Sequence, residues 1–553
     1  MKKITTLLTF SFCLVLASCN FGTTSQTQFK RGQYPINKDS SEVYLVKVNK
    51  TNSIISGINT GYVEDCRMLE VQEDDTPQQL NIQLDDNPMY EHYVQSEYFT
   101  KLNKKASDQL LISDARAKTY AKQTKDNTAT VGQTKDFFVV ASDNSFTKKQ
   151  GVCKVVNDVC NVWYISSSLD TNSRNDFIDT KILDSNATYF NNIAAKFKTC
   201  IQAEEALCGS HEYTSSLYPN VIDPKKQIDI IVYDIFFDAD GKQNGGTLGY
   251  HYSGDLIKQN EQKTLITNET QCIYIDSYFL TEQPTQVYST LVHEYNHLLN
   301  YIIKKIVNGK ECSEWFTEML SMVTEDLMQG ILQINPSMGL QGRFPYFIMC
   351  ANYGFRKWLS GNSILGPNGD DVLISYANAY IYGAYIGRNF GGPELIHRIA
   401  TNEYVDEEAI TQALRSLNIQ QVIDLDADNN PITADVDFYT TLEDEYFIMF
   451  NTNQRDITNN TWPTYYTLNN KEPLKWDENQ NVKFNGFWIA SYKISETEYL
   501  STEGFYKKSA KSRYNARPLY PYGFDINLVK EEYTSSCVID LCLNNAITYF
   551  IYY

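Results

Sequence analysis

Hydrophobic and polar positions follow two different patterns along this chain, and the change of pattern divides it. Short apolar runs such as Val43–Val48 and Phe137–Val140, separated by polar, turn-rich stretches, indicate β-strands over residues 43–166. From about residue 167 to 425, longer segments with apolar positions at helical spacing predict helices. Short aromatic-rich runs with Asn, Pro and Gly turns then return. The chain is therefore predicted to be α+β, with β-rich regions on both sides of a more helical one.

The central region is predicted to combine helices with two strands. The strands are Ile228–Tyr233 and Cys272–Ile275, and a loop rich in Gly, Asp and Asn spans residues 238–249 between them. The strongest helix is predicted at about 285–306, because apolar residues recur there at helical spacing. These residues are Val287, Leu291, Leu298 and Ile302. Further helices are predicted at about 170–206, 314–330, 345–360, 370–390 and 393–415.

The N-terminus has the features of an export signal. A basic start, Met1 to Lys3, precedes the apolar stretch Leu7 to Ala17, which is too short to span a bilayer comfortably. The stretch ends in Leu-Ala-Ser followed by Cys19, which resembles the lipobox of bacterial lipoproteins. We therefore predict a lipoprotein signal peptide over residues 1–18 and a lipid anchor on Cys19; the alternative is an ordinary signal peptide with an incidental cysteine. The expected location is the bacterial cell envelope, on the surface or facing the periplasm.

The rest of the predicted organisation follows from composition. Residues 19–42 are rich in Thr, Ser, Gln and Lys and are predicted to be a flexible tether. A β-rich N-terminal domain (43–166), a central domain (167–425) and a β-rich C-terminal domain (426–553) follow. No later run approaches the ~18 apolar residues of a membrane helix. The net charge of −19 disfavours nucleic acid as a partner, because an acidic surface repels phosphates.

The cysteine count predicts disulfide bonds. Of 12 cysteines, ten remain after Cys13 and Cys19 are set aside, which is an even number in an exported protein. Three close pairs stand out. They are Cys153 with Cys160, Cys200 with Cys208, and Cys537 with Cys542.

The strongest chemical signal is an H-E-x-x-H motif on the predicted helix 285–306. It consists of His293, Glu294 and His297, with two residues between Glu294 and His297. Residues four apart lie on one face of a helix, so both imidazoles can bind one cation. The glutamate is then placed to deprotonate a water activated by that cation. The alternative is that the two histidines are incidental and bind no metal. Because the chain has only 6 histidines, this spacing around a glutamate is improbable by chance.

Zinc held by two histidines needs a third protein ligand and one open position. The metzincin pattern would require Gly at position 300 and His at 303, and the chain has Asn300 and Ile303. The other common ligand is a glutamate on the next helix. Glu318 lies 21 positions after His297, which leaves room for a helix end, a turn and a returning helix. We therefore predict Glu318 as the third ligand. Glu314 and Glu325 are the alternatives to test.

These residues and their surroundings resemble the hyicolysin family of bacterial metallopeptidases, within the thermolysin-like glutamate-zincin group. The resemblance is carried by the run Thr290–Asn300, by Trp315–Glu318 and by Glu325-Asp326. Upstream and downstream pieces support it over roughly residues 130–415. These are Tyr233-Asp234, Gly249-Tyr250, Asp255-Leu256, Tyr274–Asp276, Tyr380–Tyr385 and Phe390–Gly392. The resemblance implies a thermolysin-like zinc metallopeptidase domain over residues 167–425.

The resemblance also points to supporting residues, with some departures. Family members usually carry Asn-Glu-Gly where this chain has Thr-Glu-Met around Glu318, and position 322, which would support a zinc histidine, is Met. Glu325 and Asp326 are the candidates for the residue that supports a zinc histidine instead. Tyr382 is the predicted stabiliser of the developing oxyanion. Tyr380 and His397 are alternative stabilisers, and core packing is the alternative role of each tyrosine.

Calcium is a second candidate ion, at Asp238, Asp240 and Asn244 in the Gly-rich loop. Their spacing differs from an EF-hand, which favours a turn that merely shapes the substrate edge.

The predicted function is a secreted, membrane-anchored zinc endopeptidase that acts on protein or peptide substrates. Glu294 serves as the base and His293, His297 and Glu318 hold the metal. One alternative is a surface-binding or adhesin lipoprotein with a relic peptidase domain, but the intact Glu294 argues against decay. Another is a zinc hydrolase of a non-peptide ester or amide.

Overall fold

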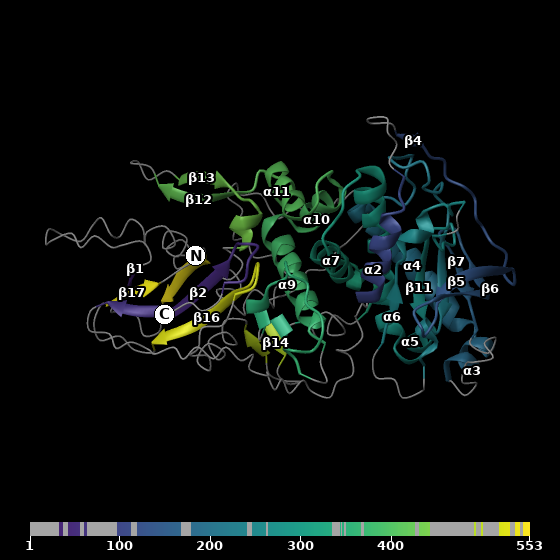
Figure 1. Cartoon of the computed structure of the whole chain (residues 1–553), viewed down its shortest axis with the longest axis horizontal. Coiled ribbons are helices and arrows are strands. Elements are labelled where there is room, and N and C mark those ends of the chain that lie inside the picture. The colour runs from purple at the N-terminus through teal and green to yellow at the C-terminus, as the bar shows by residue number, and fades with distance from the viewer. Residues whose placement is uncertain are drawn as a thin grey trace.

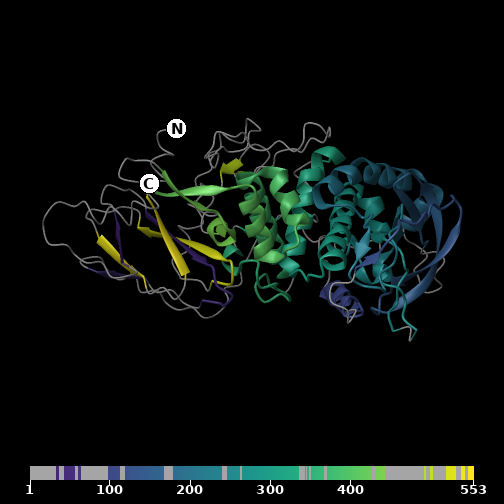
Figure 2. The ribbon, with the colours of Figure 1, turned by 90° about the horizontal axis from the view of Figure 1, so that it is seen from above.

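The computed structural model is elongated, with a mixed sheet at one end, helices in the middle and paired terminal strands at the other end (Figures 1 and 2). The structure describes residues 33–36, 43–55, 60–63, 97–111, 119–166, 178–239, 246–261, 264–334, 343, 346–347, 350–366, 370–425, 431–442, 491–493, 499–501, 519–530, 537–541 and 546–552. The predicted signal peptide and Cys19 lie outside these residues.

A six-stranded sheet forms one end of the molecule, in the order β10-β11-β9-β7-β6-β5. Its strands are β5 (Thr134–Val140), β6 (Phe146–Val156), β7 (Cys160–Tyr164), β9 (Ile228–Tyr233), β10 (Gly249–Tyr250) and β11 (Cys272–Asp276). Strands β7, β9 and β11 are parallel, while β5, β6 and β10 run antiparallel to their neighbours. The three parallel strands are buried along their whole length, as expected for strands covered on both faces.

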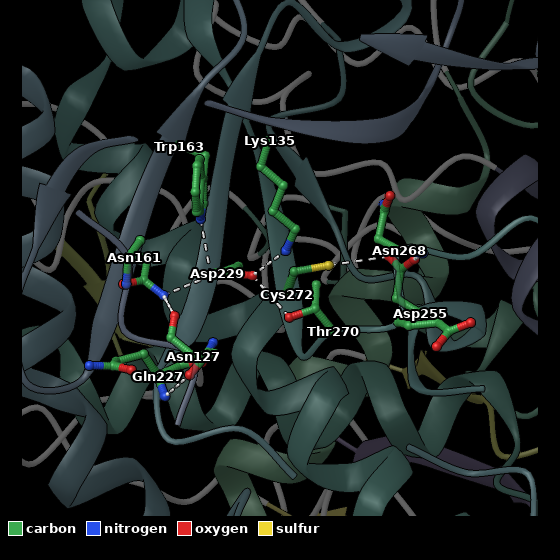
Figure 3. A network of polar contacts seen from close by, with 12 residues as sticks. Asn127, Lys135, Asn161, Trp163, Gln227, Asp229, Asp255, Asn268, Thr270 and Cys272 are labelled. Carbon is green, nitrogen blue, oxygen red and sulfur yellow. Dashed lines mark hydrogen bonds and ion pairs between the residues drawn. The ribbon is translucent and has the colours of Figure 1, made fainter. Parts of the chain in front are cut away.

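A buried carboxylate ties this sheet together (Figure 3). Asp229 on β9 accepts hydrogen bonds from Asn161 Nδ2 at 2.9 Å and Trp163 Nε1 at 3.0 Å, both on β7. It also accepts from Thr270 Oγ1 at 2.9 Å and from Lys135 Nζ on β5 at 3.2 Å. A buried charge is tolerated when it is paired and hydrogen-bonded. Asp229 therefore links strands that are far apart in the sequence.

Helices pack against the sheet and against one another. They are α2 (Glu97–Ser107), α3 (Ile178–Ser185), α4 (Thr188–Cys208), α5 (Ser277–Glu282), α6 (Pro284–Asn300) and α7 (Glu314–Leu332). Helix α4 contacts β6 and β7, and α6 contacts β10 and β11. Helix α7 packs on both α4 and α6, which buries α6 on all sides from residue 286 onward. A π-helical segment, Tyr301–Val307, continues α6.

A second group of helices forms the middle of the molecule. It comprises α9 (Val372–Phe390), α10 (Gly392–Thr401) and α11 (Asp406–Ser416), with α9 packed against α7. Short 3₁₀ helices occur at Ile235–Phe237, Ser253–Leu256 and Ala351–Tyr353.

The remaining strands pair across the length of the chain. They are β1 (Gln33–Ile36), β2 (Val43–Asn49), β3 (Thr60–Val63), β4 (Tyr120–Ala121), β8 (Ser215–Ser216), β12 (Gln420–Leu425), β13 (Pro431–Asp435), β14 (Ser491–Lys493), β15 (Tyr499–Ser501), β16 (Phe524–Lys530), β17 (Cys537–Leu541) and β18 (Ala546–Tyr552). Strand β2 lies between β16 and β18, and β17 lies between β1 and β3. N-terminal and C-terminal segments therefore share their sheets.

The α+β class predicted from the sequence is confirmed, while the strand pairing differs from the predicted division. The predicted boundary between residues 166 and 167 passes through the six-stranded sheet, because β5, β6 and β7 pair onward to β9. Strand β2, placed in the same N-terminal domain by the sequence, instead pairs with β16 and β18. Within the predicted tether, residues 33–36 form β1 and pair with β17.

Two of the three close cysteine pairs are not disulfide bonds, because Cys153, Cys160, Cys200 and Cys208 are free thiols. Cys200 and Cys208 lie on one helix, eight residues or about 12 Å apart, beyond the reach of a disulfide. Cys153 pairs in register with Trp163, which leaves it about three residues, or roughly 10 Å, from Cys160 along the strand. The side chains of Cys537 and Cys542 lie outside the described residues.

Among the helices in the described part of the chain, none is both long and apolar enough to cross a membrane.

Candidate metal centre

Helix α6 places His293, Glu294 and His297 beside the sheet. The helix begins at Pro284, whose fixed φ suits the first helical position, and apolar residues hold it against β11. His293, Glu294 and His297 are all buried, with exposed fractions of 3%, 3% and 9%. The Nε2 atoms of the two histidines are 3.1 Å apart, so both rings point to one place, as the four-residue spacing predicts.

Helix α7 brings Glu318 to the same place. Its Oε2 lies 3.1 Å from His293 Nε2 and its Oε1 lies 3.4 Å from His297 Nε2. As the residue number rises along α6, the partner number falls along α7, so the two helices are antiparallel. Among the described residues, His293, His297 and Glu318 are the one set of three or more His, Cys, Asp or Glu side chains whose ligand atoms gather this closely.

The spacing of these three side chains fits a zinc ion. Two ligands each about 2.1 Å from a tetrahedral ion lie roughly 3.4 Å from one another. The two histidine nitrogens are 3.1 Å apart, and they lie 3.1 and 3.4 Å from the Glu318 oxygens, which is close to that value. Two nitrogens and one carboxylate are a ligand set that zinc uses in catalytic sites.

The electrostatics of the site reflect its burial and its pairing. Burial alone would lower the pKa of His293, but the carboxylates of Glu318 and Glu325 outweigh it and raise that pKa well above its usual range. Burial would raise the pKa of Glu318, but the charge of His297 and hydrogen bonds from both histidines lower it to about 2. Glu318 therefore remains a carboxylate, which is the form that binds a cation.

A further set of polar side chains orients the two histidines. Glu325 Oε1 lies 2.7 Å from His293 Nδ1, and the hydroxyl of Ser289 donates to the other oxygen of Glu325 at 2.6 Å. Such a contact fixes the tautomer and leaves Nε2 for a metal. The hydroxyl of Ser321 lies 3.4 Å from His297 Nδ1. Of the two candidates for this supporting role, Glu325 and Asp326, it is Glu325 that contacts a histidine of the motif.

Glu294 lies where the sheet edge meets α6. A Cβ on Gly249 of β10 would come within 3.2 Å of Glu294 Cγ and within 2.7 Å of Thr290 Cγ2. The absence of a side chain at Gly249 therefore lets the edge strand approach the helix at Glu294.

His251, which no sequence pattern selects, also lies near this part of α6. It is two residues beyond Gly249, and only 3% of it is exposed. Burial, followed by the charge of His297, lowers the pKa of His251 to about 3, so its imidazole is neutral. No spacing motif marks this residue; its only signal is that it follows the Gly-Tyr pair of the edge strand.

Tyr382 lies in a different environment from the one predicted. It is fully buried on α9, its hydroxyl lies 2.7 Å from Thr441 Oγ1, and its ring stacks on Phe355. These are contacts of a core side chain, so the prediction of an oxyanion stabiliser at Tyr382 finds no support in the geometry. The alternatives also make other contacts: Tyr380 reaches Asp326 at 3.4 Å, and His397 Nδ1 reaches the carbonyl of Leu207 at 3.0 Å.

The calcium prediction is not tested by the described residues. Asp238 is exposed, and Asp240 and Asn244 lie outside the described part of the chain.

Two comparisons with known proteins bear on this site. The family model for Peptidase M30 matches residues 141–425, just over half of the chain, and this range includes all three candidate ligands. The neutral metalloprotease ShpI of Staphylococcus hyicus is 27% identical over 210 residues, which is 35% of this chain and 43% of that protein. The match thus spans less than half of the length of that relative. On the family match, the chain belongs to the peptidase M30 family, the hyicolysin family of metallopeptidases that its sequence resembles.

Proposed function

We propose that the protein is a zinc-dependent endopeptidase of the bacterial cell envelope. The convergence of His293, His297 and Glu318 beside Glu294 carries the proposal. Membership of the peptidase M30 family and the description of the relative as a neutral metalloprotease support peptide bonds as the substrate.

In this proposal each residue has one role. A bound zinc ion would polarise the scissile carbonyl and lower the pKa of a water. Glu294 accepts the proton of that water as it attacks and delivers the proton to the leaving amine. His293, His297 and Glu318 bind the metal, and Glu325 holds His293 in the required tautomer.

We also propose that the catalytic unit is thermolysin-like. The packing of the metal-binding helix α6 against β10 and β11 at the edge of a mixed sheet supports this. Because β5, β6 and β7 belong to that sheet, the proposed unit begins before residue 134 rather than at residue 167. The flanking β-rich region is then assembled from both N-terminal and C-terminal strands.

The anchor and the location rest on the sequence. The proposed lipid on Cys19 would hold the enzyme at a membrane, and the lipobox-like run before it supports that assignment.

A substrate panel with metal removal tests the proposed function. The purified protein is assayed on casein and on small esters, then treated with a chelator, dialysed and given zinc. We expect casein hydrolysis that disappears with the metal and returns with zinc. A zinc-loaded protein that cleaves only the esters would make it a non-peptide hydrolase, and one that cleaves nothing would favour a binding lipoprotein with a relic domain.

A further inference from the structure

His251 has a buried ring nitrogen without a hydrogen-bond partner. That atom is Nε2, and only 3% of the residue is exposed. A buried polar atom without a partner costs roughly 1–3 kcal/mol, so folded proteins rarely retain one without a reason.

The position of His251 relates this nitrogen to the metal centre. A Cβ on Gly249, two residues earlier, would meet the side chains of Glu294 and Thr290, so this segment runs along the ligand-bearing side of α6. The His251 ring lies 6.2 Å, centre to centre, from the ring of Tyr301. Tyr301 follows His297 by one helical turn and therefore lies on the same side of the helix. His251 thus faces the end of the site next to His297.

Helix α2 fixes the backbone on both sides of this histidine. Asn103 Nδ2 donates to the carbonyl of His251 at 3.0 Å, and Asn103 Oδ1 accepts from the backbone N–H of Ser253 at 2.8 Å. Ser107 of the same helix donates to the hydroxyl of Tyr301 at 3.2 Å. A group that is already oriented loses little entropy when a ligand arrives, which is what a site for developing charge requires.

His251 is not part of the ligand set. The described side chains close enough to share one ion are His293, His297 and Glu318. Its burial is similar to that of His293 and Glu294, so it lies below the surface as they do. An imidazole can donate one N–H while it is neutral, so a histidine here need not bring a charge that would repel the metal.

From these observations we propose that His251 donates a hydrogen bond from Nε2 to the carbonyl oxygen of the substrate, and that this bond strengthens as negative charge develops there. The inference rests on the proposed peptidase function. As the water oxygen bonds to the carbonyl carbon, the C=O π pair moves onto the oxygen, and Glu294 accepts the proton of the water. His251 keeps its own proton throughout. The C–N bond then breaks, and the amine leaves with the proton from Glu294.

The test compares His251→Leu and His251→Gln with wild type, using a quenched fluorescent peptide selected for cleavage by the wild-type enzyme. We expect His251→Leu to keep its zinc and to lower kcat by about 10²–10³-fold with little change in KM. His251→Gln, which retains an N–H donor, should lose less activity. Affinity for an N-phosphoryl dipeptide, which mimics the tetrahedral state, should fall in parallel, whereas affinity for acetohydroxamate, a small metal ligand, should not change.

His211→Gln is the matched control, because His211 is also a buried histidine whose Nε2 lacks a partner. Its Nδ1 contacts Glu205 behind α6, so its loss should lower Tm and leave kcat within about threefold of wild type. If His251→Leu fails to fold, Asn103→Ala gives the second test, since it releases the backbone of His251 and should lower kcat without loss of zinc.

Three outcomes would overturn the role of His251. They are a folded, zinc-loaded His251→Leu with kcat within threefold of wild type, an activity loss that merely follows zinc loss, and an equal loss in His211→Gln. Failure of the proposed function itself would look different, because wild type would then cleave no peptide. In that case binding of the N-phosphoryl dipeptide to the zinc-loaded variants still tests the contact.

Discussion

At the scale of single residues, the proposed roles separate Glu294, as the base, from the residues that bind the metal. Glu294 lies beside the edge strand at Gly249, whereas the close ligand set consists of His293, His297 and Glu318. A change at Glu294 should therefore affect proton transfer and leave the ion in place.

Replacement of Glu294 by Gln should abolish hydrolysis and preserve the metal. The amide has nearly the same shape but cannot accept the proton, so activity should fall by roughly 10²–10⁴-fold or more. Zinc content by elemental analysis should stay at one ion per chain. Activity within about tenfold of wild type would remove Glu294 from the role of base.

Replacement of Glu318 by Ala should weaken zinc binding strongly. Two imidazoles alone form an incomplete site, and Glu318 approaches both of them. Glu314→Ala is the matched control on the same helix, because Glu314 accepts a hydrogen bond from Thr100 at 2.7 Å instead. Competition with a fluorescent chelator measures both affinities. If Glu314→Ala loses the metal and Glu318→Ala keeps it, the ligand assignment is wrong.

At the scale of elements, the junction of β10 with α6 depends on a glycine. In Gly249→Ala the new Cβ would lie 2.7 Å from Thr290 Cγ2 and 2.8 Å from the carbonyl of Tyr274, so the strand must move. We expect a loss of about 1–3 kcal/mol in the free energy of unfolding and a lower kcat. Gly387→Ala is the control, because its Cβ would meet Ile396 at an ordinary 3.4 Å within α9. Equal urea midpoints for the two variants would contradict the tight junction.

The free energy of unfolding should also depend on pH through Asp255, which lies in the 3₁₀ helix Ser253–Leu256 and accepts a hydrogen bond from Tyr274 of β11. Burial raises the pKa of this carboxyl to about 6, although hydrogen bonds such as that from Tyr274 oppose the shift. The folded state therefore holds the proton more tightly than the unfolded state. Stability should fall by about 3 kcal/mol as pH rises from about 4 to about 6 and then level off. Asp255→Asn should lack this decline in urea titrations across that range, and an unchanged slope would contradict the assignment.

The sequence predicted individual elements better than their limits. The helix expected at 393–415 is two helices, because Lys304 Nζ donates to the carbonyls of Asn402 and Tyr404 at 2.7 Å each and stabilises the break. Of the described residues in the helix expected at 345–360, residues 346, 347 and 350 are helical, residues 351–353 form a 3₁₀ turn, and residues 354–360 are not helical. The local spacing of apolar residues carries no information about tertiary contacts of this kind.

The same limit explains which site residues were predictable. His293, Glu294 and His297 share one helix, and helical spacing alone brings them together. His251 enters the site through sheet pairing of β10 with β11, which brings together residues with no fixed spacing in the sequence. Tyr382 lies on an aromatic-rich helix, and an aromatic pattern does not distinguish a core residue from a catalytic one.

At the scale of the whole molecule, the paired terminal strands and the metal centre lie toward opposite ends, with α9, α10 and α11 between them (Figure 1). Parallel pairing of β7 with β9, and antiparallel pairing of β2 with β16 and β18, join distant parts of the chain. Such pairing cannot be read from the sequence, because strands so far apart leave no local pattern.

Cys19→Ser should release a soluble, active enzyme. The proposed anchor lies well before β5, the first strand of the sheet that supports the metal centre, so catalytic folding should not depend on it. Membrane partitioning and casein hydrolysis are compared with wild type in the same host. A Cys19→Ser protein that still fractionates fully with membranes would show that another contact holds it there.

Zinc-edge anomalous diffraction from crystals of the protein tests the central claim most directly. The account predicts one strong peak about 2.1 Å from His293 Nε2, His297 Nε2 and an oxygen of Glu318. A zinc peak bound elsewhere, with none between these three side chains in zinc-supplemented crystals, would contradict it.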